Sequence, residues 1–99
     1  MKFIELNNGN YLSIYKKGGE GGSNWDEQLI VKVDANDKFD IIANESVGYC
    51  HDCGDWAKIS LKINQDGFEL TEIRDSMKLV NDKWEREWRK KKKLKTVKL

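Results

Sequence analysis

The last third of the chain carries the clearest periodic pattern of hydrophobic and polar positions. Between residues 75 and 93, at about 100° per residue, four apolar side chains fall within one narrow arc: Met77, Val80, Trp84 and Trp88. Basic side chains fall on the opposite side: Arg86, Arg89, Lys90 and Lys93. The pattern predicts an amphipathic helix with an apolar face that packs on a sheet and a basic face that is exposed.

The first fifteen residues predict a hairpin. A three-residue turn at residues 7–9, with Gly9 supplying a positive φ, places four aliphatic side chains on one face: Ile4, Leu6, Leu12 and Ile14. Tyr11 and Tyr15 then lie on the reverse face, which is expected to be exposed.

Alternating apolar residues predict further strands at 29–33, 39–43, 57–63 and 68–73, joined in pairs by polar turns at 34–38 and 64–67. The glycine-rich residues 18–24 are expected to form a flexible linker. The expected fold class is α+β, an antiparallel sheet of about five or six short strands under one C-terminal helix. That helix is expected to cover Ile59, Leu61, Ile63 and Leu70. Residues 1–93 are predicted to form one domain and residues 94–99 a basic tail.

Charge is distributed unevenly along the 99 residues. The formal net charge is only +1, but residues 86–99 hold eight Lys or Arg and one Glu, a net charge of +7. The residues before them therefore carry −6. An acidic body with a basic end suggests that this end meets an anionic partner.

The expected cellular location determines the expected state of the two cysteines. No apolar run is long enough for a transmembrane helix, and the first residues are too polar for a signal peptide, so a cytoplasmic protein is expected. Cys50 and Cys53 would then be reduced and would shape a loop between strands. Their C-x-x-C spacing also suits zinc, completed by Asp52 or Asp55 or by a second subunit. With only two cysteines, no cofactor is predicted, and zinc is kept as an alternative.

Catalysis finds little support in the sequence. His51 is the only histidine, no nucleophile or phosphate-loop motif occurs, and no helix follows Cys53 to activate a redox thiol. An enzyme is therefore not expected.

The residues predicted to contact a partner are the basic run and three aromatics: Arg86, Arg89, Lys90, Lys91, Lys92, Lys93, Tyr11, Tyr15 and Trp25. The favoured interpretation is a small non-enzymatic binding or inhibitor protein that acts on a host protein or a nucleic-acid-handling complex, such as a CRISPR effector. A composition rich in Lys, Asn and Ile and lacking Pro is typical of phage or mobile-element genes. One alternative is direct nucleic-acid binding through the basic helix. Another is a zinc-bridged dimer through Cys50 and Cys53.

Overall fold

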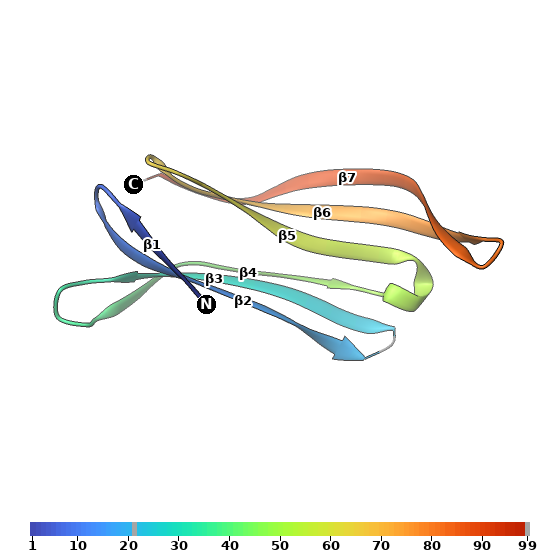
Figure 1. Ribbon diagram of the computed structural model, residues 1–99, viewed down its shortest axis with the longest axis horizontal. Coiled ribbons are helices and arrows are strands. Elements are labelled where there is room, and N and C mark those ends of the chain that lie inside the picture. Colours follow the sequence, from blue (N-terminus) through green and yellow to red (C-terminus); the bar gives the residue numbers. More distant parts are fainter. Residues whose placement is uncertain (21, 99) are drawn as a thin grey trace.

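Seven β-strands in two antiparallel sheets make up the fold in the computed structural model, which describes residues 1–20 and 22–98 (Figure 1). Sheet A contains β1 (Lys2–Leu6), β2 (Gly9–Glu20), β3 (Ser23–Val33) and β4 (Phe39–Tyr49), in that order. A single 3₁₀ turn, η1 (His51–Cys53), leads to sheet B, which contains β5 (Asp55–Asn64), β6 (Gly67–Val80) and β7 (Lys83–Lys98). The four strands predicted between residues 29 and 73 are confirmed.

The predicted C-terminal helix is wrong, and with it the α+β fold class. Residues 75–93 form the end of β6 and most of β7, which fold back on each other at Asn81 and Asp82. Both turn residues have positive φ, 52° and 64°, as a two-residue type I′ hairpin requires. A β-bulge then separates the two tryptophans: Trp84 lies opposite Leu79, and Trp88 lies opposite Ser76 on the other face of the sheet.

The first hairpin has a different register from the predicted one. Leu6 pairs with Gly9 around a two-residue turn, so Ile4 lies opposite Tyr11. Leu12 and Ile14 consequently lie on the outer face of sheet A, and Tyr11 is fully buried. The expected exposure of Tyr11 is therefore wrong.

The glycine-rich segment is also not a linker. Gly18 pairs with Trp25 and Gly19 with Asn24, so the two strands run almost to the end of this hairpin. A Cβ on Gly18 would lie 2.4 Å from the Trp25 ring, which explains why the position opposite this tryptophan is a glycine. Gly21, within the predicted linker, lies outside the described residues.

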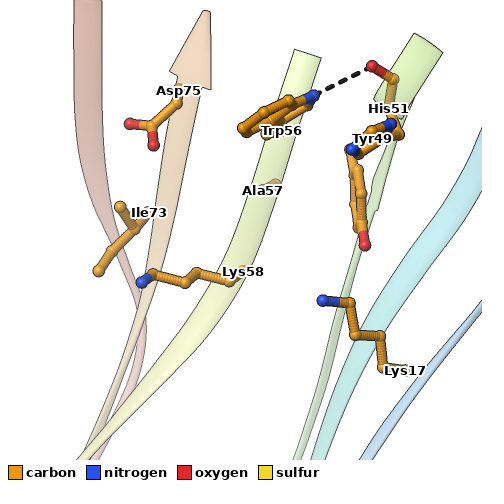
Figure 2. A pocket seen from close by; sticks show the side chains of 8 residues that line it. All are labelled: Lys17, Tyr49, His51, Trp56, Ala57, Lys58, Ile73 and Asp75. Atoms are coloured by element: carbon orange, nitrogen blue, oxygen red, sulfur yellow. Dashed lines mark hydrogen bonds between the residues drawn. The ribbon is translucent and has the colours of Figure 1, made fainter. Parts of the chain in front are cut away.

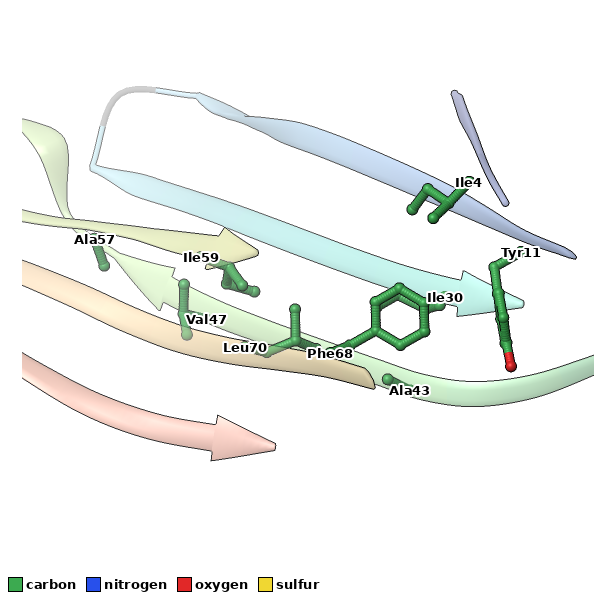
Figure 3. Packing of buried hydrophobic residues seen from close by; sticks show 9 residues of the cluster. All are labelled: Ile4, Tyr11, Ile30, Ala43, Val47, Ala57, Ile59, Phe68 and Leu70. Carbon is green, nitrogen blue, oxygen red and sulfur yellow. The ribbon is translucent and has the colours of Figure 1, made fainter. Parts of the chain in front are cut away.

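The core lies between the two sheets and is built from both (Figure 3). Sheet A contributes Ile4, Tyr11, Ile30, Ala43 and Val47, and sheet B contributes Ala57, Ile59, Phe68 and Leu70. The Tyr11 and Phe68 rings meet edge to face with centroids 5.0 Å apart. Leu94 and Val97 of β7 also pack against this cluster, so residues 94–98 belong to the sandwich and are not a free tail. Leu99, the last residue of the predicted tail, is outside the described part.

A buried carboxylate joins the sheets beside this core. Asp26 of β3 is fully buried, and it accepts hydrogen bonds from the Tyr15 hydroxyl and from the backbone N–H of Ile59, the latter at 2.8 Å. Ile59 lies on β5, an edge strand of sheet B, so its N–H has found a partner in the opposite sheet. Burial and the neighbouring carboxylate raise the pKa of Tyr15 well above its ordinary value, which keeps the hydroxyl a donor.

Arg74 of β6 forms a second link between the sheets. Its guanidinium donates two hydrogen bonds of 2.7 Å to Asp55 and one of 2.8 Å to the carbonyl of Gly48 at the end of β4. The resulting molecule is long and thin, 55 × 25 × 16 Å. Its radius of gyration is 16.1 Å, whereas a compact chain of this length has about 13 Å. Much of each sheet is therefore surface.

Replacing Asp26 tests whether this carboxylate holds the sheets together. Asp26→Ala leaves the Tyr15 hydroxyl and the Ile59 N–H without their acceptor, and the free energy of unfolding should fall by about 3 kcal/mol in urea titrations. Asp40→Ala, at an exposed position of β4, is the control and should stay within about 0.5 kcal/mol of the parent. A loss below about 1 kcal/mol for Asp26→Ala would contradict this role.

Candidate functional site

The outer face of sheet B gathers basic side chains from both of its edge strands. Residues directly opposite one another form rows across the three strands: Trp56–Asp75–Arg89, Lys58–Ile73–Lys91 and Ser60–Thr71–Lys93. We call this surface the basic face and define it by its bases: Lys58, Lys62, Arg86, Arg89, Lys91 and Lys93. Strand alternation therefore divides the lysine run, because Lys90 and Lys92 point to the opposite side of β7.

Few acids balance these charges. Arg89 donates two hydrogen bonds, of 2.7 and 2.9 Å, to Asp75 and holds the pKa of this carboxyl below its ordinary value. Glu69 is only loosely paired, 3.9 Å from the Lys93 ammonium. Within residues 1–20 and 22–98, the other four bases of the face have no carboxylate within 4.0 Å: Lys58, Lys62, Arg86 and Lys91. They are available to bind an anion.

A shallow groove follows the middle of the basic face. Its floor is formed by Glu69, Thr71 and Ile73 of β6, with Lys62 on the β5 side and Lys91 and Lys93 on the β7 side. An elongated anion with an uncharged, flat component fits such a surface better than a small ion does, because the positive charges lie on both sides of a strip that contains the uncharged Thr71 and Ile73 and one acid, Glu69.

Aromatic rings lie at one end of the basic face. His51 stacks on Trp56 with centroids 4.8 Å apart and planes 7° apart, and Trp84 meets Trp56 edge-on at 5.6 Å. The Trp56 Nε1–H donates to the carbonyl of His51 at 3.0 Å. The turn between the sheets thus fixes the orientation of the indole.

That turn contains the two cysteines, which are joined in a disulfide with Cα atoms 5.2 Å apart, so the expected reduced pair is not what the structure contains. Sulfurs bonded to each other offer no thiolate to zinc. No group of three or more His, Cys, Asp or Glu side chains that could hold a metal occurs in the described part of the chain. Asp55, one of the carboxylates considered for zinc, is bound to Arg74 instead. Gly54 completes the turn in a left-handed conformation, and its carbonyl accepts the N–H of Met77 on β6 at 2.6 Å.

The structure separates the residues predicted to bind a partner. Only Arg86, Arg89, Lys91 and Lys93 share the basic face. Lys90 lies on the opposite side, with its ammonium 4.8 Å from the centre of the Trp88 ring. Trp25 is 42% exposed but belongs to sheet A, and Tyr15 is engaged by Asp26.

Sequence reasoning missed the contribution of β5. Trp56, Lys58 and Lys62 occupy alternate positions of a strand with an apolar inner face, which is the signal that places them together outside. The sequence does not show that β5 and β7 both pair with β6, which places them at the two edges of the same sheet.

The outer face of sheet A has the opposite character. One uninterrupted apolar row crosses all four strands: Phe3, Leu12, Val31 and Ile41. We call this surface the apolar face. Phe3 is 56% exposed, Ile41 65% and the neighbouring Phe39 62%. Since sheet B packs on the inner face, no described strand covers the apolar face (Figure 1).

Comparison of the chain with protein families, with curated proteins and with solved structures finds no match. In residues 1–20 and 22–98 there is also no helix with the length and apolarity needed to cross a membrane.

Removing the disulfide should have a mild effect. Cys50 and Cys53 are three positions apart, so their bond closes a very short loop and restricts the unfolded chain little. The variant with both cysteines changed to Ser should lose about 2 kcal/mol of unfolding free energy or less, measured by urea titration. A much larger loss, or one zinc ion per chain or per dimer by elemental analysis of the reduced protein, would mean that the cysteines hold a metal.

Proposed function

We propose that this protein is a non-enzymatic module that binds single-stranded nucleic acid on its basic face. The observation that carries the proposal is the placement of Lys and Arg side chains on both edge strands of sheet B, on either side of the groove along β6. Lysines and arginines at such positions neutralise backbone phosphates, and the contacts are independent of base sequence.

The shape of the face favours a single strand over a duplex. Most of the basic side chains lie on the three-stranded part of sheet B, which is broader than the helix or two-stranded ribbon that a major groove admits. The nucleobases of a single strand, in contrast, can lie flat on apolar and aromatic side chains. The surface offers Ile73 in the groove and Trp56 at one end of the basic face.

The absence of an enzymatic role is part of the same proposal. Its support is that the single histidine, His51, is stacked on Trp56 and has the exposed Asp52 as its carboxylate neighbour, 3.6 Å away. We further propose a cytoplasmic location, where the Cys50–Cys53 disulfide of the structure would be reduced. Backbone hydrogen bonds, from Cys53 to Cys50 at 3.2 Å and from Gly54 to His51 at 3.1 Å, then maintain the turn.

Strand alternation supplies a matched test. Lys91→Gln with Lys93→Gln removes two charges from the basic face, whereas Lys90→Gln with Lys92→Gln removes two from the opposite side of the same strand. On a twelve-nucleotide single-stranded DNA, the first pair should reduce the slope of log affinity against log salt by about 1.4, since each phosphate contact contributes about 0.7. Fluorescence anisotropy at several salt concentrations measures both pairs.

The control pair should leave this slope nearly unchanged. Equal effects of the two pairs would show that only overall charge matters, and failure of the parent protein to bind at low salt would refute the proposal.

A second candidate function is supported by the apolar face. Exposed, contiguous apolar surface on a small protein is typical of a protein-binding site, so a protein partner on sheet A is compatible with nucleic acid on sheet B. The predicted action on a host protein complex is kept here as the binding of a protein partner to the apolar face. The phage or mobile-element origin and the CRISPR-effector target stay predictions.

Charged residues on the apolar face should abolish protein binding selectively. Phe3→Glu with Ile41→Glu changes two exposed positions, so circular dichroism and the melting temperature should stay close to the parent values. Capture of protein partners from nuclease-treated cell extract should be lost in this variant and kept in the Lys91/Lys93 variant. The reverse pattern, or loss in both variants, would exclude the apolar face as the docking surface.

A further inference from the structure

The Cys50–Cys53 disulfide ties together no distant parts of the chain. The two cysteines are three positions apart, in the turn between β4 and β5. Backbone hydrogen bonds close the same turn, because the N–H groups of Cys53 and Asp55 both donate to the carbonyl of Cys50, at 3.2 and 3.0 Å. The turn therefore persists when the S–S bond is broken, and the two sulfurs stay close enough to form the bond again.

The two cysteines differ in their access to solvent. Cys53 is exposed, whereas Cys50 is partly buried. The tip of the β2–β3 hairpin lies beside the Cys50 sulfur, since a Cβ on Gly22 would be 3.5 Å from it. A thiolate from solution therefore meets the Cys53 sulfur first. Exposed disulfides exchange readily with thiols, and the disulfides of cytosolic proteins are usually transient.

We propose that Cys50 and Cys53 form an exchange site for small thiols of the glutathione type, and that the disulfide form fixes the aromatic end of the basic face for binding. The proposal rests on the proposed nucleic-acid binding and on the cytoplasmic location, where glutathione keeps thiols reduced.

Reduction proceeds in two exchange steps. A glutathione thiolate attacks the Cys53 Sγ and forms a mixed disulfide, while the Cys50 Sγ leaves with the electron pair of the broken S–S bond and takes a proton from water. A second glutathione thiolate then attacks the glutathione sulfur of the mixed disulfide and releases the Cys53 thiolate. Two glutathione molecules are oxidised to one glutathione disulfide, and the protein gains two thiols. Glutathione disulfide drives the reverse reaction.

The exchange site is in contact with two indoles at the end of the basic face. His51, between the cysteines, stacks on Trp56 and accepts its indole N–H, as Figure 2 shows. Gly54, directly after them, accepts the N–H of Met77 at 2.6 Å, and a Cβ on it would be 3.2 Å from the Trp84 ring. Without the S–S bond, only hydrogen bonds restrain this turn, so the indoles are held less firmly. An aromatic surface that is fixed beforehand binds a base at a smaller entropic cost.

Equilibration of the protein with mixtures of reduced and oxidised glutathione tests the exchange site. Iodoacetamide labelling and mass spectrometry count the free thiols. The count should change reversibly between none and both of the two cysteines, while circular dichroism stays constant. A disulfide that resists excess reduced glutathione until the protein unfolds, or thiols that stay free in oxidised glutathione, would overturn the exchange site.

Two matched variants test the order of attack. Cys50→Ser leaves the exposed sulfur and should form a mixed disulfide with oxidised glutathione rapidly, whereas Cys53→Ser leaves the partly buried sulfur and should react more slowly. Equal rates in the two variants would overturn the assignment of Cys53 as the sulfur that is attacked.

The twelve-nucleotide DNA tests the link to the basic face. The oxidised protein should bind it about threefold more tightly than the reduced protein, as expected when side chains are ordered before binding. The variant with both cysteines changed to Ser is the control and should match the reduced protein in either buffer. Equal affinities of the oxidised and reduced protein would refute the link. If neither form binds the DNA, the proposed function fails, whereas the thiol count still decides the exchange site.

Discussion

The relation between the two sheets depends on one buried carboxylate. Asp26 is desolvated in the inner face of sheet A, which is costly unless the charge is hydrogen-bonded. Tyr15 supplies one donor from the same sheet, and the edge of β5 supplies the other through the Ile59 N–H. This contact determines where β5 crosses sheet A. It thereby holds β5, which carries Trp56 and Lys58, against sheet A, and it leaves the outer face of sheet B free.

The fold can be predicted from the spacing of apolar residues only where that spacing fits either the helical or the strand period and not both. Alternation over residues 57–63 fits only a strand, and the strand is there. Trp84 and Trp88 are four positions apart, which suits one helical turn and equally two strand repeats. The Asn81–Asp82 turn was the deciding signal, because both residue types tolerate positive φ. For the first hairpin, a turn shorter by one residue exchanged the roles of Tyr11 and Leu12.

The candidate site was predictable only in part for a related reason. The charge asymmetry directed attention to residues 86–93, but which of their side chains share a face depends on the strand period and on the bulge near Trp88. The participation of Lys58 and Lys62 follows from strand order, which a single sequence does not contain. Similarly, nothing in the sequence distinguishes Asp26 from the other acidic residues, because its contacts with Tyr15 and Ile59 depend on the packing of the two sheets.

The strand order has a consequence for the way the chain folds. Each strand pairs with its neighbour in sequence, in both sheets, so strand pairing requires only short loops to close. Each sheet can therefore form locally, and the contacts between the sheets, such as those of β3 with β5 and of β4 with β7, are the ones that must span a long stretch of chain. Until they form, the Asp26 carboxylate can remain hydrated. The carboxylate thus loses its water shell in the final step of folding, when the two sheets pack together and the Ile59 N–H replaces water as its donor.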